Sequence, residues 1–246
     1  MFFCGSTEFG LETVVNRASS WRVVCFDLDG TLVEGAVFIW DLLHEHFGTD
    51  RHRRRLAKQD YFARRISYET WFRHDLDLLS ERGADKAAIE AMIREHLRPV
   101  PGAAQTLERI KEAGLILGLV SGSLDIVLSA FFPVDLFDHV FLNRIRFDDQ
   151  GRIAGGVHTP YDLDRKADGL VEIARRSGVG PDRCVFVGDN YNDLSAAGVA
   201  GMTVAYRPRS SELRSRADLV IESGPLTAML PALGLHARAD SSQTVE

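Results

Sequence analysis

One segment restricts the fold of this chain more than any other. Four apolar residues, Val23–Phe26, run directly into two acidic ones, Asp27 and Asp29. A short and nearly all-apolar run is typical of a strand that is buried on both faces of a parallel sheet. The chain must leave the sheet at the carboxylates, and Gly30 lets the backbone turn without a side-chain clash. The segment therefore predicts a buried strand with acidic side chains at its carboxyl end.

The rest of the chain alternates between apolar runs and amphipathic stretches. Strands are expected at residues 115–120, 184–187, 202–206 and 218–221, helices at 103–113, 125–132 and 165–177, and a hairpin around 148–151. This alternation predicts an α/β fold, a parallel sheet with helices on both faces. The stretch from about Gly35 to Arg98 has helical spacing without a clear strand, so we expect a helical module inserted after the first strand.

Polar clusters follow three of the predicted strands. Because ligands of open α/β sheets bind at the carboxyl ends of the strands, these clusters are expected to meet at one rim. Carboxylates gathered there repel one another unless a cation or protons hold them together, and hard oxygen ligands suit Mg²⁺. The clusters are Asp27 with Asp29, Ser121 to Ser123, and Gly188 to Asp193, with Lys166 opening a helix between the last two.

These clusters resemble the four motifs of the haloacid dehalogenase-like hydrolases. The motifs are DxDGT at residues 27–31, SGS at 121–123, the lone Lys166, and GDNYND at 188–193, in the family's order. The resemblance runs from about residue 21 to 222. It implies a Rossmann-like parallel core with an inserted helical cap of the C1 type, and the SGS form most resembles the phosphoserine-phosphatase branch. The domains implied are a core of residues 1–33 and 99–234, a cap of 34–98, and a flexible tail of 235–246.

The resemblance also implies a reaction, the hydrolysis of a phosphate monoester. Asp27 resembles the nucleophile that becomes an aspartyl phosphate. Asp29 resembles the general acid that protonates the leaving oxygen and then the base that activates water. Lys166 would bind the phosphate and the Asp27 carboxylate, and would stabilise charge in the transition state.

The remaining motif residues are implied as ligands of the phosphate and of Mg²⁺. The Ser121 side chain and the Gly122 amide would hold the phosphate at a point where a strand gives way to a helix, and the serines would also cap that helix. Asn192 is a further candidate contact to the phosphate. The metal ligands implied are Asp27, the Asp29 backbone carbonyl and Asp189, with Asp193 supporting the metal from behind or orienting Lys166.

The expected substrate is a small phosphorylated metabolite, and its identity stays open. Phosphoserine phosphatases hold the amino and carboxylate groups of their substrate with an acidic residue after the first motif and an arginine in the cap. Those places fall on Ala36 and Asp75 here, with Glu34 and Arg73 two residues away from each. A different phosphorylated metabolite is therefore at least as well supported as phosphoserine.

Other functions remain open at this stage. A phosphotransferase or mutase would use the same aspartyl phosphate, and a non-catalytic binding protein with this fold would be expected to have lost a motif residue. A dehalogenase lacks the second aspartate. A phosphonatase needs a lysine in the cap, where Lys58 and Lys86 lie without a supporting motif.

Composition limits the partners. A formal net charge of -6 and a pI of about 5.8 argue against nucleic acid, because binding to phosphate backbones favours a basic surplus. No apolar run reaches the ~18 residues of a membrane span. The three cysteines, Cys4, Cys25 and Cys184, follow no metal-binding spacing, and the last two are expected in the core. A reducing, cytoplasmic setting is therefore expected, and the oligomeric state stays open.

Several polar and aromatic residues are expected to serve structure rather than chemistry. Asp162 and Asp164 are expected to be exposed. The basic run of Arg51 and Arg53 to Arg55 is interpreted as a solvated helix face, with attraction of an anionic substrate as the alternative. Loop structure is expected of Asn190 and Tyr191. Most aromatic side chains of the insert are expected in its core, with one or two facing the substrate: Trp40, Phe47, Tyr61, Phe62, Trp71 and Phe72.

Overall fold

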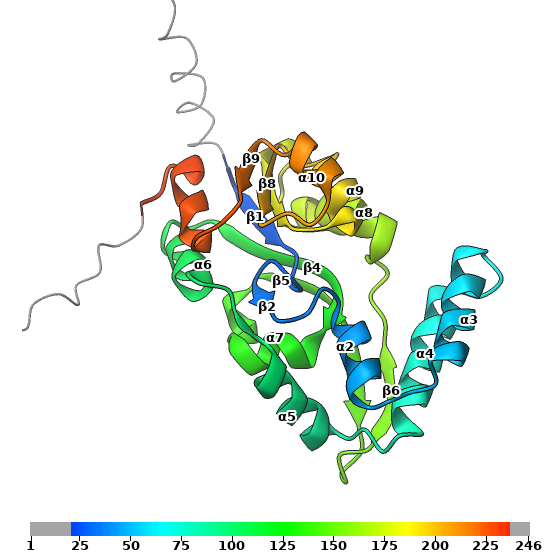
Figure 1. Cartoon of the computed structure of the whole chain (residues 1–246). Coiled ribbons are helices and arrows are strands. Elements are labelled where there is room, and N and C mark those ends of the chain that lie inside the picture. The colour runs from blue at the N-terminus through cyan, green and yellow to red at the C-terminus, as the bar shows by residue number, and fades with distance from the viewer. Residues whose placement is uncertain (1–20, 237–246) are drawn as a thin grey trace, which may run out of the picture.

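A seven-stranded sheet forms the centre of the computed structural model, which describes residues 21–236 (Figure 1). The strand order is β6-β5-β4-β1-β7-β8-β9. All neighbouring strands pair in parallel except β5 and β6, which form the antiparallel hairpin at one edge. The predicted α/β fold and hairpin are thus confirmed. The strands are β1 (Val23–Phe26), β4 (Ile116–Leu124), β5 (His139–Phe147), β6 (Ile153–Val157), β7 (Cys184–Gly188), β8 (Met202–Tyr206) and β9 (Leu219–Ile221).

Helices cover both faces of this sheet. On one face pack α6, α7 and the 3₁₀ helix η5, and on the other pack α8 and α9. The sheet is therefore buried on both sides, as parallel sheets are. The helices are α6 (Ala103–Glu112), α7 (Asp125–Phe131), η2 (Leu163–Arg165), α8 (Lys166–Arg176), η4 (Tyr191–Asp193), α9 (Leu194–Ala197), α10 (Ser211–Arg216) and η5 (Leu226–Leu233).

The first strand is apolar throughout because its side chains alternate between two apolar clusters. Val24 and Phe26 belong to the cluster beneath α6 and α7. Val23 and Cys25 belong to the cluster beneath α8. Each of these four side chains is fully buried, so β1 is a rigid anchor for whatever follows it.

A helical segment is inserted between β2 (Val33–Glu34) and β3 (Arg98–Pro99), which pair antiparallel at its base. Three of its four helices begin at a side chain that caps the helix: Asp50, Ser67 and Asp85 accept hydrogen bonds from backbone N–H groups of the first turn. The predicted boundaries of core, cap and tail stay predictions, and residues 1–20 and 237–246 lie outside the described residues. The helices are α2 (Ile39–His46), α3 (Arg51–Phe62), α4 (Tyr68–Ser80) and α5 (Lys86–His96).

One predicted boundary is wrong. The strand expected to end at Val120 continues as β4 to Leu124, because Leu124 still pairs with Asn143 of β5 across a register irregularity. The following helix begins at Asp125, and its N-cap, Leu124, contributes no side-chain hydrogen bond. Ser121 to Ser123 therefore do not cap that helix. They lie in the irregular last part of the strand.

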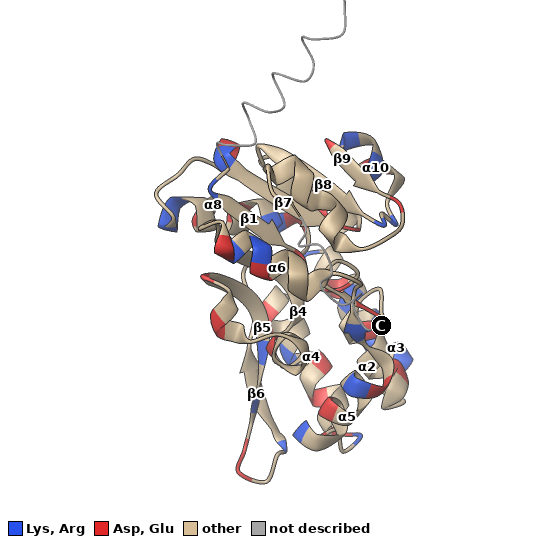
Figure 2. Cartoon of the chain, turned by 90° about the vertical axis from the view of Figure 1, so that its left-hand side faces the viewer, with Lys and Arg blue, Asp and Glu red and all other residues tan. Residues whose placement is uncertain are grey.

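Charged residues of both signs are interspersed over the sheet-bearing part and the helical segment (Figure 2). Within residues 21–236, no helix combines the length and the hydropathy that crossing a bilayer would require. Cys25 and Cys184 are buried free thiols, as expected, and Cys4 lies outside the described residues.

Candidate active site

A buried lysine joins two of the motif aspartates. Lys166, the first residue of α8, donates hydrogen bonds from Nζ to Oδ1 of Asp27 at 2.6 Å and to Oδ1 of Asp193 at 2.7 Å. All three side chains are buried, and none of the lysine side chain is exposed. The sheet produces this meeting, because Asp27 follows β1 and Asp193 lies in the loop after the adjacent strand β7.

Electrostatics bind this trio tightly. Burial alone would lower the pKa of Lys166, but the carboxylates of Asp193 and Asp27 raise it above its usual value. Burial raises the pKa of Asp27 to about 7, although the lysine opposes that rise. The lysine is therefore a permanent cation that compensates part of the negative charge of the site.

The loop after β7 is ordered by its own side chains. Oδ2 of Asp193 accepts hydrogen bonds from the backbone N–H groups of Asp189 at 2.9 Å and Asn190 at 3.0 Å. The Asn190 side chain in turn accepts from the Tyr191 N–H at 2.9 Å, so the expected structural role of Asn190 is confirmed. Tyr191 belongs to this loop and also lines the pocket described below, where its ring is half exposed.

Three buried carboxylates can hold a cation here. Asp27, Asp189 and Asp193 each offer an oxygen, and these oxygens lie within 4.8 Å of one another. Oδ1 of Asp189 is buried without a hydrogen-bond partner, and burial, with Asp193 and Asp27 nearby, raises the pKa of Asp189 to about 9. Lys166 and Arg209, which lies 3.2 Å from Asp189, leave that oxygen unsatisfied. An all-oxygen set with an unpaired acceptor fits Mg²⁺.

The second aspartate of the first motif points away from this cluster. Oδ2 of Asp29 accepts from the N–H of Ile39, the first residue of α2, at 2.8 Å. Oδ1 accepts from Oγ of Ser123 at 2.7 Å. Burial raises the pKa of Asp29 to about 6, even though both hydrogen bonds lower it. A carboxyl group with this pKa can release and take up a proton near neutrality.

The SGS segment lies beside these carboxylates. Oγ of Ser121 accepts from the N–H of Ser123 at 3.2 Å. The Gly122 carbonyl accepts from Nε1 of Trp40 at 3.0 Å and from Nδ2 of Asn143 at 2.7 Å. With its carbonyl held from two sides, the peptide plane at Gly122 is fixed in the lining of the pocket described below.

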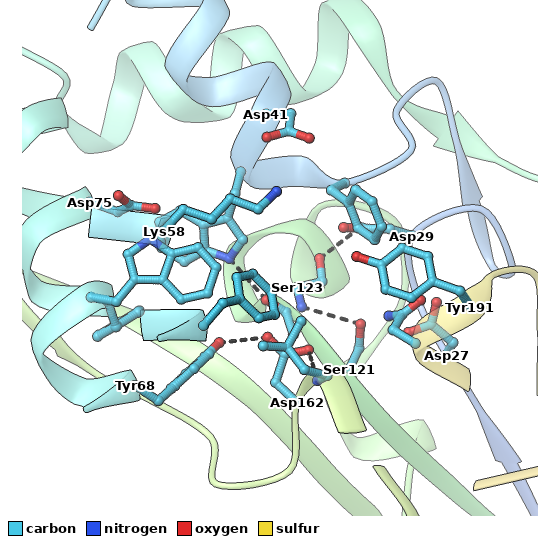
Figure 3. A pocket seen from close by; sticks show the side chains of 18 of the residues that line it. Asp27, Asp29, Asp41, Lys58, Tyr68, Asp75, Ser121, Ser123, Asp162 and Tyr191 are labelled. Carbon is cyan, nitrogen blue, oxygen red and sulfur yellow. Dashed lines mark hydrogen bonds between the residues drawn. The ribbon is translucent and has the colours of Figure 1, made fainter. Parts of the chain in front are cut away.

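One pocket is lined by several of the motif residues and by side chains of the helical segment (Figure 3). Asp27, Asp29, Asn192 and the SGS segment form its floor. Aromatic side chains form much of its wall, so more of the insert's aromatic residues face the pocket than the one or two expected. They are Phe38, Trp40, Phe62, Tyr68, Trp71 and Phe72 of the insert and Tyr191 of the core.

Asp162 was expected to be exposed, and that expectation is wrong. Its side chain packs against Gly122, where an added Cβ would lie 2.2 Å from its carboxylate. Tyr68 of α4 donates from its hydroxyl to Oδ2 of Asp162 at 2.7 Å and accepts from Nδ2 of Asn143 at 3.1 Å. Sequence reasoning missed this cluster because no local pattern marks it. Asp164 is exposed, as expected.

The residues considered above for binding the amino and carboxylate groups of phosphoserine lie apart from one another. Glu34 pairs with Arg98 at 3.2 Å and with Arg207 at 2.9 Å, while Arg73 is exposed. Asp75 lines the pocket but is surrounded by His44, His74 and Arg54, at 3.5, 3.5 and 3.7 Å. Arg54 also lines the pocket, so the basic run is not only a solvated face.

Comparisons with known proteins agree with this architecture. The model of the haloacid dehalogenase-like hydrolase family matches residues 21–201. A phosphoserine phosphatase from Methanocaldococcus jannaschii is 28% identical over 211 residues, covering 85% of this chain and 96% of that protein. One from Polaromonas is 28% identical, covering 91% and 97%. A solved substrate-bound phosphoserine phosphatase complex superposes with a TM-score of 0.65 at 26% identity, covering 86% and 97%. A phospho-aspartyl intermediate analogue of phosphoserine phosphatase gives a TM-score of 0.63 at 26% identity, covering 86% and 98%.

Proposed function

The chain belongs to the haloacid dehalogenase-like hydrolases, and we propose that it is a Mg²⁺-dependent phosphatase that hydrolyses a small-molecule phosphate monoester through an aspartyl phosphate on Asp27. One observation carries the proposal. The Asp27 carboxylate lies at the floor of the pocket and is held by Lys166 at 2.6 Å. The phospho-aspartyl intermediate analogue described for a similar phosphoserine phosphatase supports it.

In the first half of the reaction, a carboxylate oxygen of Asp27 attacks phosphorus and the bond to the alcohol oxygen breaks. Asp29 donates its proton to that oxygen as the alcohol leaves. Lys166 compensates the charge on Asp27 and on the incoming phosphate, while Ser121 and the Gly122 N–H hold the phosphate oxygens. Asn192, at the edge of the floor, is a further contact to the phosphate.

In the second half, water attacks the phosphorus of the aspartyl phosphate. Asp29, now ionised, takes a proton from that water, and the bond between phosphorus and Asp27 breaks. Asp27, Asp189 and the Asp29 backbone carbonyl would hold Mg²⁺, with Asp193 behind them. When bound, the ion supplies positive charge that lets the phosphate dianion approach a carboxylate.

The setting proposed is a reducing, cytoplasmic one. The buried thiols of Cys25 and Cys184 support it, because neither has a disulfide partner among residues 21–236.

The test of the mechanism is Asp27→Asn. We expect hydrolysis of a generic phosphate monoester to fall on the order of 10³-fold or more, since the nucleophile is lost. Asp164→Asn, an exposed aspartate of the same core, is the matched control and should retain activity. Acid quenching during turnover of a phosphorus-labelled substrate should leave the label on the Asp27 peptide. Label on another residue, or on none, would falsify the proposal.

The same experiment separates hydrolysis from phosphoryl transfer. Adding an acceptor alcohol should leave water as the main acceptor of the phosphoryl group. A new phosphate ester as the main product would instead indicate a phosphotransferase.

Removal of divalent cations by a chelator should abolish turnover, and Mg²⁺ should restore it.

A further inference from the structure

The wall of the pocket above the carboxylates is rich in aromatic side chains. Trp40 and Phe72 meet edge to face, with ring centroids 5.6 Å apart. Trp71 stacks on Tyr61 with ring centroids 5.0 Å apart, and this contact holds the Trp71 ring in place in the wall. Across the mouth, Phe38 packs against Tyr191 of the core at 6.1 Å. Aromatic side chains bury a large apolar area when they pack against another ring. The single methylene of phosphoserine would cover little of this wall.

The acidic groups of the wall already face donors or cations. Asp41 pairs with Arg54 at 2.7 Å. Asp75 has Arg54 and two histidines within 3.7 Å. Asp162 accepts hydrogen bonds from Tyr68 and from the N–H of Leu163. A substrate ammonium group would therefore have to displace existing partners, and would meet the arginine as it did so. The wall disfavours a free amine.

One cationic side chain of the wall is unpaired. Lys58 of α3 lines the pocket, and no hydrogen bond or ion pair holds its ammonium group among the residues that the structure describes. Figure 3 shows its side chain extending over the pocket below Asp41. Trp71 adds an indole N–H that is buried without a hydrogen-bond partner. The part of the pocket lined by α3 thus offers positive charge.

We propose that the substrate is a phosphomonoester whose alcohol part is a flat apolar group ending in an anion, and that Lys58 binds that anion. The inference rests on the proposed phosphatase function and names the substrate class of the same site. The phosphate occupies the floor, the flat group lies against the aromatic wall, and the anion reaches α3. The class lacks a free ammonium group, which separates it from phosphoserine.

The test compares four substrates: benzyl phosphate, para-carboxybenzyl phosphate, para-(aminomethyl)benzyl phosphate and phosphoserine. The three benzyl alcohols are leaving groups of similar acidity, so differences in kcat/KM among them report binding of the substituent. We expect the carboxylate to raise kcat/KM about fivefold over benzyl phosphate and the amine to lower it about fivefold, the effect of a partly exposed charge pair. Benzyl phosphate should exceed phosphoserine by about tenfold or more, given the ring that it buries.

Two variants assign the effects to residues. Lys58→Gln should lower kcat/KM for the carboxylate about fivefold and so remove its advantage, while Lys86→Gln on α5, outside the pocket, should preserve it. Phe62→Ala should raise KM for the benzyl phosphates more than for phosphoserine. Leu56→Ala, at a half-exposed position of the same helix outside the pocket, is its control. Both Phe62 and Lys58 are exposed, so neither change threatens folding.

The results separate this inference from the function on which it rests. Preference for phosphoserine over all three benzyl phosphates overturns the inference and leaves the phosphatase standing. An unchanged carboxylate advantage in Lys58→Gln also overturns it. Failure of all four substrates to label Asp27 overturns the proposed function itself, and the inference with it.

Discussion

Gly30 brings the backbone close to the carboxylate of Asp189. Its φ of +85° lies in the left-handed region, and a Cβ built on it would lie 2.2 Å from Oδ2 of Asp189. A side chain at this position would therefore push the carboxylate away from its neighbours. The glycine therefore preserves the arrangement of the carboxylates proposed to hold the metal as well as the turn.

Replacing Gly30 by alanine should weaken metal binding. We expect the Mg²⁺ concentration for half-maximal activity to rise on the order of tenfold, because displaced metal ligands typically cost that much. The control is Gly151→Ala in the β5–β6 turn, where φ is +77° but a Cβ would have only ordinary contacts, with Lys86. Both variants carry the same backbone strain. Equal Mg²⁺ dependence in the two variants would show that contact with Asp189 is unimportant.

At the scale of elements, α4 is tied to the core through one phenol. The Tyr68 hydroxyl donates to Asp162, which precedes η2, and accepts from Asn143 of β5. Residues that lie 94 and 75 positions apart in sequence are joined in this way. The link holds the aromatic wall over the motif residues.

Removing this phenol should loosen the wall. Tyr68→Phe deletes two hydrogen bonds and leaves the Asp162 carboxylate without its side-chain donor, so the free energy of unfolding should fall by roughly 1–2 kcal/mol. KM should rise several-fold, because the aromatic wall is then held less firmly over the motif residues. Tyr61→Phe is the matched control, since no hydrogen bond to the Tyr61 hydroxyl exists within the described part of the chain. A KM that is equal in both variants would contradict this role.

Helices α2, α3 and α4 meet around a second carboxylate. Burial alone would raise the pKa of Asp75, but His44, His74 and Arg54 together hold it below its usual value. When folding lowers the pKa of a carboxyl group, that group stabilises the folded state at pH values above its unfolded pKa of about 3.9. That contribution disappears as the pH falls through the folded pKa.

Asp75→Asn should therefore destabilise the protein most at neutral pH. Urea unfolding at pH 7 should show a loss of roughly 1–3 kcal/mol, because Arg54 loses the counter-charge of Asp75 in a buried setting. As the pH falls below about 4 and through the lower folded pKa of Asp75, the difference from the unmodified protein should shrink, since Asp75 then becomes protonated in the folded state as well. A difference that grows toward acid would have the wrong sign for this network.

At the scale of the whole molecule, the site depends on three adjacent strands and one helix. Asp27 and Asp189 follow β1 and β7, Ser121 lies in the last part of β4, and Lys166 comes from α8 on one face of the sheet. A ligand that engages all of them would tie the sheet, α8 and the pocket together. Binding to the folded state alone must raise stability by linkage.

Mg²⁺ with beryllofluoride, which mimics the phosphoryl group on an aspartate, should therefore raise the melting temperature. At about 100 times its Kd it would add about 2.7 kcal/mol, equivalent to a shift of roughly 5–10 °C for a chain of this size. Asp27→Asn should show no shift, and Asp164→Asn should show the full one. If the melting temperature of the unmodified protein is the same with and without Mg²⁺ and beryllofluoride, that result would count against an acyl-phosphate site.

The carboxyl ends of β1 and β7 could be predicted directly from the sequence. The side chains of β1 must be apolar on both faces, so the first residue that cannot be buried, Asp27, marks the rim. The same reasoning located Asp189 after β7. The exit from β4 was misplaced, because the pairing of Leu124 with Asn143, which prolongs the strand, depends on a neighbour that the local sequence does not reveal.

The α/β fold, the helical insertion and the catalytic candidates could be predicted from the sequence alone, because strand burial and motif spacing are visible along the chain. Which side chains of the insertion face the carboxylates depends on the packing of the folded protein. Helical periodicity gives each helix an apolar face without saying what that face meets, and the contacts of Lys58, Tyr68 and Asp162 follow from the packing of α3 and α4 over the sheet rim.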